Sequence, residues 1–308
     1  MIAFNEIQKE KEPGFHLVLG TVQLGMDYGV ANKTGKPDLR TAFEIVRTAW
    51  DHGISFFDTA QAYGDSEEVL GKCFKKLRVG NKAQPAVISK IILNNNINDT
   101  DRIIKRVDVS IEKLGLYNLW GLMLHRESCL DTGEKFLTKI ASKLKSSKKI
   151  ENFGVSVYSA EKAIEALYMP EIDIVQVPFN VFDQRALDKG VFHLAAENKK
   201  TVFIRSVYLQ GLLLLKPDQL SKEMEFSRKA LKKYNDFCMT YNISRKLFAL
   251  AFVINNAPDG MIVIGSEKPD QVKENVSLFE KAKGISIPDS NSLSVSDQRV
   301  INPSLWHQ

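Results

Sequence analysis

Short apolar segments alternate with longer amphipathic segments along most of this chain. The apolar segments run for four to six residues without a polar interruption, which is typical of strands buried on both faces. We expect eight such strands, at residues 16–19, 54–57, 86–89, 119–124, 153–157, 172–177, 201–204 and 261–264.

Between these runs, apolar residues recur at the three- and four-residue spacing of a helix that packs one face inward. The helices predicted from this spacing lie near residues 39–50, 69–77, 103–114, 134–144, 160–168, 184–198, 224–241, 244–255 and 269–282. Ser159 is the expected N-cap of the helix at 160–168. Strict alternation of strand and helix indicates parallel strands joined by right-handed crossovers.

Two parallel architectures fit this alternation, a closed barrel and an open, doubly wound sheet. Eight strands favour the barrel, and no Gly-x-Gly-x-x-Gly follows the first strand, as a dinucleotide-binding open sheet would require. The predicted fold is therefore α/β, a single (β/α)8 TIM barrel domain spanning residues 1–308. A polar, irregular C-terminal tail is expected at about 285–308.

The composition and charge of the chain limit the classes of molecule that it is expected to bind. The 308 residues are 44% hydrophobic and 26% charged, with a net charge of +5, and the charges are spread along the chain. A lysine-rich stretch at 143–149 falls on the last turn of a predicted helix, where cations suit the helix dipole. The longest apolar runs, such as 212–215, are too short to cross a bilayer. We expect neither nucleic acid nor membrane as a partner, and the sequence leaves the oligomeric state open.

The cysteines and histidines indicate neither crosslinks nor a metal site. Cys73, Cys129 and Cys238 are far apart, which argues against a disulfide framework and fits a reducing, cytoplasmic location. The N-terminal residues 1–11 are polar and do not resemble a signal peptide. The five histidines lack paired ligand spacing, so no metal is expected. Thiol catalysis at Cys129 lacks an activating base, and packing is its better interpretation.

The candidate chemistry lies where successive strands end. The segment 54–64 runs from a buried strand into Asp58 and Tyr63, while Lys90 and His125 follow the next two strands. Active sites of parallel barrels form at these carboxyl ends. Singly, each residue has an ordinary structural interpretation as a cap, packing or surface residue. Four suitable groups at three neighbouring strand ends favour a common site.

These four side chains suit proton donation to an oxygen. A free tyrosine has a pKa near 10 and needs a cation to stabilise its phenolate. Lys90 supplies the cation, Asp58 holds the ammonium, and a histidine beside the phenol orients a carbonyl oxygen. The matching reaction is hydride delivery to a carbonyl carbon from a nicotinamide.

The same segments carry a resemblance to a known family. The chain resembles the aldo-keto reductase family through six linked motifs that extend from about residue 17 to 279. The motifs are GISFFDTAQAYG (53–64), ISK (88–90), LMLH (122–125), FGVS (153–156), QVPFN (176–180) and VIGS (263–266). The resemblance implies an eight-fold β/α barrel, an NADPH or NADH cofactor and reversible reduction of aldehydes and ketones. It also implies that Tyr63 is the general acid, that Lys90 and Asp58 lower its pKa, and that His125 orients the substrate.

The resemblance further implies a set of cofactor contacts that runs from the nicotinamide to the adenosine. They are Ser156 and Gln176 at the carboxamide; Gly20, Thr21 and Asp58 at the ribose; Ser206, Leu209 and Gly211 at the pyrophosphate; and Ser266, Gln271, Glu274 and Asn275 at the adenosine.

Three positions depart from the family pattern. Val157 replaces an asparagine that often binds the carboxamide, and Arg205 stands where an aromatic ring commonly stacks on the nicotinamide. A guanidinium plane can also stack on a ring. Gln271 replaces an arginine often found near the 2′-phosphate, and Lys268 is expected to supply that charge, with Lys273 nearby. The family pattern and these lysines favour NADPH, with NADH left open.

The substrate is indicated only by a polar, glycine-rich loop at residues 21–32. This loop resembles the corresponding loop of bacterial aldo-keto reductases associated with sugar and surface-polysaccharide metabolism. The resemblance implies a small-molecule carbonyl that is polar, such as a sugar or nucleotide-linked sugar. Tyr28, His125, Tyr158, Phe179 and Trp306 are candidates to line its pocket. An alternative on the same fold is a catalytically weak regulatory subunit that binds the cofactor.

Overall fold

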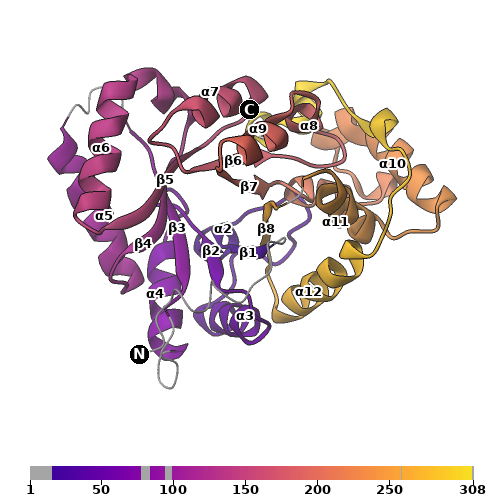
Figure 1. The fold of residues 1–308 in the computed structure, drawn as a ribbon. Helices are drawn as coiled ribbons and strands as arrows, with labels where there is room; N and C mark the ends of the chain where they lie inside the picture. Colours follow the sequence, from indigo (N-terminus) through magenta and orange to yellow (C-terminus); the bar gives the residue numbers. More distant parts are fainter. Residues whose placement is uncertain (1–15, 78–83, 94–98, 258, 307–308) are drawn as a thin grey trace.

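In the part of the chain that the structure describes, eight parallel strands close into a barrel in chain order (Figure 1). The structure is a computed structural model, and it describes residues 16–77, 84–93, 99–257 and 259–306; the polar segment 1–11 lies outside them. Strand β1 pairs with β2 on one side and with β8 on the other, which completes the closure. The strands are β1 (His16–Gly20), β2 (Phe56–Asp58), β3 (Ala86–Ile91), β4 (Leu119–Leu124), β5 (Ile150–Ser156), β6 (Ile174–Pro178), β7 (Thr201–Arg205) and β8 (Met261–Gly265). The predicted TIM barrel is confirmed.

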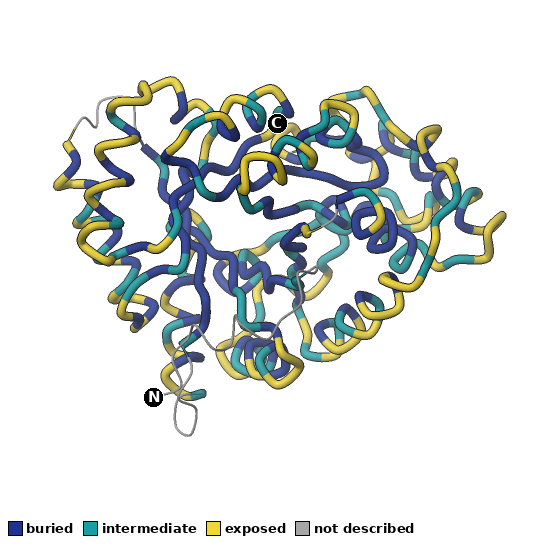
Figure 2. Tube along the Cα trace, viewed as in Figure 1, coloured by how far each residue is buried: buried dark blue, intermediate teal, exposed yellow. Residues whose placement is uncertain are grey.

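Helices ring the barrel on its outside (Figure 1). The α-helices of the described residues are α2 (Val22–Gly25), α3 (Leu39–Asp51), α4 (Ser66–Leu77), α5 (Thr100–Leu114), α6 (Glu134–Ser146), α7 (Ala160–Tyr168), α8 (Arg185–Asp188), α9 (Val191–Glu197), α10 (Arg228–Thr240), α11 (Arg245–Asn256), α12 (Pro269–Lys283) and α13 (Gln298–Ile301). Short 3-10 segments connect several of them: η1 (Glu127–Thr132), η2 (Leu209–Leu214), η3 (Pro217–Gln219), η4 (Lys222–Ser227), η5 (Asn291–Leu293) and η6 (Pro303–Leu305). Burial follows this arrangement, because the strands are buried and the outward helix faces are exposed (Figure 2).

Local polar residues define several helix ends. Asp38 caps α3 by accepting a hydrogen bond from the Thr41 amide, and Asp99 caps α5 in the same way. The Ser159 hydroxyl accepts from the Lys162 amide, as predicted for the N-cap of α7. Such caps satisfy amides that the first helical turn leaves without partners.

The barrel interior is separated from the layer between strands and helices. A small cluster of apolar side chains fills the interior, and the much larger remaining core packs the strands against the helices. The interior cluster consists of Val18, Ile88, Met123, Ile174, Phe203 and Met261, with Phe56, Trp120 and Val263 packed against it. Because side chains alternate between the two faces of a strand, every second residue beyond this cluster also points toward the barrel axis.

Two predicted helices and the tail differ from the sequence prediction. The single helix expected at 184–198 is wrong: Gly190 adopts a left-handed φ of 72°, which ends α8 and starts α9. The helix expected at 224–241 begins as η4 and becomes α-helical only at Arg228. The tail is less irregular than expected, since η5 buries Leu293, α13 buries Val300 and Ile301, and η6 buries Pro303. A few apolar residues spaced among polar ones are enough to dock it.

The cysteines and the apolar helices have ordinary environments. Cys73, Cys129 and Cys238 are buried free thiols, and burial raises the pKa of Cys73 and Cys238 to about 11. No cluster of three metal-binding side chains occurs among the described residues. Within the same residues, no single helix has both the length and the apolar character to cross a bilayer. One pair of helical segments has the required length and apolar character only when the two are taken together, Lys222–Thr240 and Arg245–Asn256. These two segments are bent by 91° at the break between them.

Gly154 is predicted to be required by the contact between β5 and β6. A Cβ at this position would lie 1.9 Å from the Ile174 carbonyl oxygen of the paired strand. Gly154→Ala should therefore lower the free energy of unfolding by about 3 kcal/mol, measured by urea denaturation, because strand backbones cannot separate without breaking the ladder. Gly284→Ala is the control: the nearest atom is 3.8 Å away and φ is −94°, so a change within ~0.5 kcal/mol is expected. Equal stability of the two variants would refute this close packing.

Candidate active site

Strand periodicity places three of the predicted catalytic side chains on the barrel axis. Asp58, Lys90 and His125 each lie two positions after a residue of the interior cluster or packed against it. Since residues i and i+2 share one face of a strand, all three point into the barrel at its carboxyl end. Gln176 and Arg205 obey the same rule on β6 and β7.

The Lys90 ammonium is the centre of this group. Its Nζ donates to Asp58 Oδ2 at 2.6 Å, to the Thr59 carbonyl oxygen at 3.2 Å and to Tyr63 Oη at 3.3 Å. Lys90 is fully buried and Asp58 is 4% exposed. The three donor positions of the ammonium are thus directed at an anion, a carbonyl and the phenol.

The Asp58 carboxylate is held from its other side as well. Gln176 Nε2 donates to Asp58 Oδ1 at 2.9 Å, and Ser156 Oγ lies 3.3 Å from Gln176 Oε1 as its donor. The Thr21 amide and hydroxyl both donate to the Asp58 backbone carbonyl. Strands β1, β5 and β6 therefore fix the position of the acid on β2.

Tyr63 reaches the site because the backbone turns very tightly after β2. Gly25 of α2 and Gly64 pack against each other, so that a Cβ on Gly25 would lie 1.8 Å from the Tyr63 carbonyl oxygen. Gly64 has a φ of 57°, in the left-handed region that favours glycine. The Tyr63 ring meets the His125 ring edge to face, with 5.5 Å between ring centroids. All four predicted catalytic residues are therefore in one place.

Electrostatics keep the resting phenol protonated. Burial raises the pKa of Tyr63 and the Asp58 charge raises it further, while the Arg205 charge opposes both. Burial lowers the pKa of Lys90, and the Asp58 carboxylate counteracts this. The expectation that Lys90 and Asp58 lower the phenol pKa needs refinement for the resting site, because the carboxylate largely neutralises the ammonium. The resting Tyr63 thus carries a proton to give.

His125 is a neutral imidazole at physiological pH. Burial lowers its pKa to about 3, and the charges of Lys90, Arg205 and Arg126 add to this effect. Its Nδ1 is buried and has no partner among the described residues. A neutral imidazole retains one N–H donor for a ligand oxygen.

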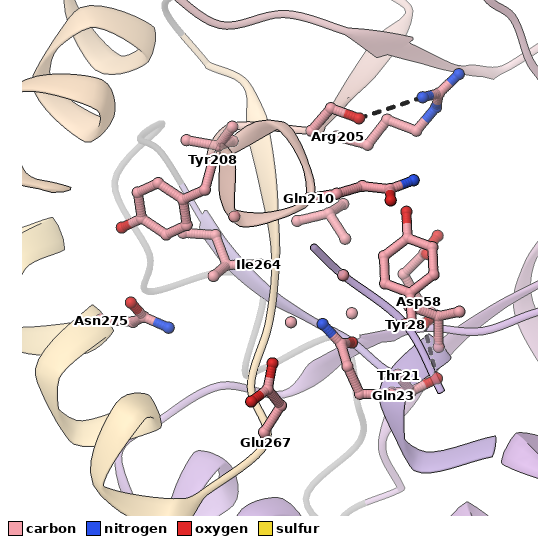
Figure 3. Close-up of a pocket in the computed structure, with 18 of the residues that line it drawn as sticks. Thr21, Gln23, Tyr28, Asp58, Arg205, Tyr208, Gln210, Ile264, Glu267 and Asn275 are labelled. Atoms are coloured by element: carbon pink, nitrogen blue, oxygen red, sulfur yellow. Dashed lines mark hydrogen bonds between the residues drawn. The ribbon is translucent and has the colours of Figure 1, made fainter. Parts of the chain in front are cut away.

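Two connected cavities open at this end of the barrel. The inner cavity extends from Thr21 and Asp58 to Glu267 and Asn275 (Figure 3). The outer cavity, of about 720 Å³, adds His125 and the loop at 26–35. The residues common to both are Tyr28, Gly29, Tyr63, Gln176, Arg205 and Gln210. The phenol therefore stands where the two cavities meet.

The inner cavity, of about 200 Å³, has a polar lining that suits part of an elongated ligand such as a dinucleotide. Gln23 Oε1, Tyr208 Oη and Asn275 Oδ1 are buried without a partner among the described residues, and all three residues line this cavity. Buried polar atoms normally have partners, so these atoms indicate groups that a ligand would satisfy. Gly265 leaves room beside them, since a Cβ there would lie 2.3 Å from the Gln23 side chain.

Most of the cofactor residues expected from sequence line these cavities. Those of the inner cavity are Gly20, Thr21, Asp58, Gln176, Arg205, Ser206, Gly211, Gln271 and Asn275, and Ser156 lines the outer one.

Four expected cofactor residues line neither of the two cavities. Leu209 is fully buried in the apolar core, and Ser266 Oγ accepts a bond from Asn275 Nδ2 at 3.2 Å. Glu274 forms an ion pair with Lys246 at 2.6 Å, and Lys268 is exposed at the start of α12. The structure places these four side chains outside the lining of both cavities. Sequence spacing located this segment but could not show which side chains face inward.

Other lining residues were missed by sequence analysis. They are Gln23, Tyr208, Lys246 and Glu267. Glu267 directly follows the VIGS motif, and that adjacency was the signal available in the sequence.

The substrate-side expectations were correct for three aromatic or imidazole residues. Tyr28, His125 and Tyr158 line the outer cavity. Phe179 does not, because its ring packs in the core against neighbouring phenylalanines. Trp306 instead donates its indole N–H to the Arg299 carbonyl, while the tail lines the cavity at 303–304.

Comparison with known proteins agrees with this geometry. The family model described as the aldo/keto reductase family matches residues 16–286. The NADH-specific methylglyoxal reductase of Escherichia coli (strain K12) is 27% identical over 296 residues, covering 85% of this chain and 88% of that protein.

An aldo-keto reductase of Bacillus halodurans, solved in a holo form, superposes with a TM-score of 0.70 at 19% identity, over 92% of this chain and 94% of that one. A glycerol dehydrogenase of Gluconobacter oxydans gives a TM-score of 0.66 at 21% identity, with 92% of each chain covered. A family match over most of the chain, on a barrel whose strand ends bring Asp58, Tyr63 and Lys90 together, shows that this protein belongs to the aldo/keto reductase family of NAD(P)H-dependent oxidoreductases.

Proposed function

We propose that this enzyme reduces an aldehyde or ketone to an alcohol with Tyr63 as the general acid. The observation that carries this proposal is the bridge formed by Lys90 Nζ, which is 2.6 Å from the Asp58 carboxylate and 3.3 Å from the Tyr63 hydroxyl. A purely structural role for Lys90 would not explain why the phenol that it contacts lines both cavities.

The proton transfer follows from the charges around the phenol. A bound nicotinamide supplies the hydride for the carbonyl carbon. As negative charge grows on the carbonyl oxygen, Tyr63 gives up its hydroxyl proton to that oxygen, and the alcohol forms. Lys90 then stabilises the phenolate by a charge-assisted hydrogen bond, and Asp58 keeps the buried ammonium charged and in position.

His125 has an orienting role in this proposal. Its ring lies edge to face with Tyr63, and the residue lines the outer cavity, where its N–H can meet a substrate oxygen. Because the imidazole is neutral, it positions the substrate oxygen without competing to protonate it.

We propose NADH as the preferred cofactor. The family pattern favours NADPH through Lys268 and Lys273, but these are not among the side chains that line the inner cavity. Glu267 lines its far end, where Lys246 is paired with Glu274. Burial raises the pKa of Glu267, and the nearby Lys268 charge opposes this shift. A carboxylate accepts a hydrogen bond from a ribose 2′-hydroxyl and repels a 2′-phosphate. The E. coli relative's NADH specificity supports the same choice.

Replacing the phenol is predicted to stop reduction and preserve cofactor binding. Tyr63→Phe should lower kcat about 10²- to 10⁴-fold, the usual contribution of a positioned acid. The cofactor dissociation constant should change less than about twofold, because the hydroxyl acts on the substrate oxygen. Turnover is measured by cofactor oxidation against a panel of aldehydes and ketones, and binding by cofactor fluorescence.

Tyr28→Phe is the matched control for this prediction. Tyr28 is also a phenol of the same cavities and is half-buried, with its pKa raised to about 12, but it has no bond to Lys90. Loss of the Tyr28 hydroxyl should reduce kcat by less than about tenfold, which is the effect of losing one ordinary hydrogen bond. A larger loss of kcat in Tyr28→Phe than in Tyr63→Phe would instead assign the general acid to Tyr28. A wild-type protein that binds cofactor but reduces none of the panel would favour the regulatory alternative.

His125 is predicted to stay neutral down to low pH. Its imidazole NMR signals, assigned by comparison with His125→Gln, should not titrate between pH 5 and 8. Its pKa falls from about 6.5 in the unfolded chain to about 3 when folded, so the unfolded chain binds the extra proton. Stability should therefore be lost as pH falls below about 6.5. Urea denaturation of His125→Gln should show a shallower loss; a titration near pH 6.5 in the folded protein would contradict this.

The carboxylate of Glu267 is predicted to select NADH. Glu267→Gln should tighten NADPH binding roughly tenfold, since removing ~1.4 kcal/mol of repulsion corresponds to that factor, and should weaken NADH binding. The dissociation constants of both cofactors are measured by fluorescence titration without substrate. Glu280→Gln removes an exposed carboxylate from the same helix region and should leave both constants unchanged. Tighter binding of NADPH than NADH by the wild type would overturn the assignment.

A further inference from the structure

Arg205 places a cation without a counter-ion at the junction of the two cavities. It ends β7, is half-buried, and lines both the inner and the outer cavity. Nη2 donates to the Val157 carbonyl at 3.1 Å, and Nη1 donates to Ser206 Oγ at 3.3 Å. Its Cζ lies 4.2 Å from the centroid of the Tyr158 ring. Among the described residues, none of these partners is an anion.

The charges nearest the phenol do not offset this cation, and Asp27 of the outer cavity is exposed and accepts a hydrogen bond from the Lys36 amide. The Lys90 ammonium is already paired with Asp58, and His125 is neutral. The carbonyl of Val157 and the ring of Tyr158 stabilise a guanidinium but leave its charge in place. A partly desolvated cation in a cavity attracts an anionic ligand, because the interaction is screened less than on an open surface.

The guanidinium is directed to the substrate side of the site. Both Val157 and Tyr158 belong to the segment that follows β5, and Tyr158 lines the outer cavity beside His125. Figure 3 shows Arg205 on the opposite side of the inner cavity from Glu267 and Asn275. The cation that lines that opposite end is Lys246. An anion bound by Arg205 therefore lies near Tyr63 and away from the far end of the cofactor cavity.

The segment that supports Arg205 is itself held in place. Glu127 Oε2 accepts hydrogen bonds from the Tyr158 and Ser159 amides at 2.8 and 3.0 Å. Arg185 donates to the Tyr158 carbonyl at 3.2 Å and is paired with Asp183. These hydrogen bonds fix the backbone of Tyr158, whose ring lies under the Arg205 guanidinium. The bonds of Arg205 to Val157 and Ser206 use two of the five N–H donors of an arginine, and the planar fork suits two oxygens of one anion.

We propose that Arg205 selects carbonyl substrates that carry an anionic group, a carboxylate or a phosphate, which it binds while the carbonyl oxygen lies at Tyr63 and His125. This inference rests on the proposed carbonyl reduction and adds the charge class of the substrate. It also gives the departure from the family's aromatic residue a function in substrate recognition.

The test compares pairs of aldehydes that differ in one anionic group. Succinic semialdehyde is paired with butanal for the carboxylate, and glyceraldehyde 3-phosphate with glyceraldehyde for the phosphate. The quantity measured is the ratio of kcat/KM between the anionic and the neutral member at saturating cofactor. The wild type should favour the anionic member of at least one pair, and the pair identifies which anion is bound. Arg205→Gln should reduce that ratio about 10- to 100-fold, as expected for a charge-assisted bond, mainly through KM.

Two further variants separate charge from geometry. Arg205→Lys keeps the charge and loses the planar fork, so it should recover part of the ratio. Lys33→Gln removes a cation from the exposed rim of the outer cavity and should change the ratio less than about twofold, because exposed charges are screened. An unchanged ratio in Arg205→Gln, or an equal loss in Lys33→Gln, would overturn the proposal.

A binding measurement tests the proposal independently of turnover. Calorimetry of 4-hydroxybutyrate and of 1-butanol binding to the cofactor-loaded wild type and Arg205→Gln reports anion recognition even if no carbonyl is reduced. Tighter binding of the anion, lost in the variant, supports the proposal; equal binding of the two ligands, or a loss confined to cofactor affinity, overturns it. Absence of reduction with every aldehyde, alongside normal anion binding, would instead refute the proposed reaction alone.

Discussion

The site depends on a fully buried lysine ammonium that is held by one carboxylate. Lys90 cannot remain charged in the barrel without Asp58, since burial favours its neutral form. Asp58 in turn is fixed by Gln176 and by the Thr21 contacts to its backbone carbonyl. The phenol of Tyr63 takes the remaining donor of the ammonium. Every step proposed for the reaction requires this charge pair to be assembled before the substrate arrives.

The barrel assembles the pair by strand periodicity. Side chains on the inner face repeat every second residue, so the apolar interior passes directly into the polar site as each strand ends. Ile88 fills the interior and Lys90 enters the site; Phe203 and Arg205 are related in the same way. Stability and chemistry thus share the same strands, and a shift of one residue in register would turn the ammonium toward the helices.

Charge is distributed unequally along the connected cavities. The cation of Arg205 lies at the junction near the phenol, and the carboxylate of Glu267 lies at the far end. The central pair of Lys90 and Asp58 is neutral as a unit. We infer that the reaction centre is generic for carbonyl reduction, while the two outlying charges set which substrate and which cofactor enter. This division lets ligand choice vary without disturbing the buried pair.

The sequence by itself determined the barrel and the place of its candidate site. Strand and helix periods depend on local alternation of apolar and polar residues, and Asp58, Tyr63, Lys90 and His125 directly adjoin predicted strands. Tertiary structure decided features that depend on residues distant in the chain. The break at Gly190 required a backbone angle, and the docking of Val300 required a partner surface. The inward or outward direction of Glu267, Lys268 and Glu274 required α12 to be packed against α3 and α11. The local pattern of apolar and polar residues encodes which face a strand buries. The direction of a loop side chain follows only from long-range packing. The charges that a ligand meets in the cavities therefore also depend on the tertiary structure.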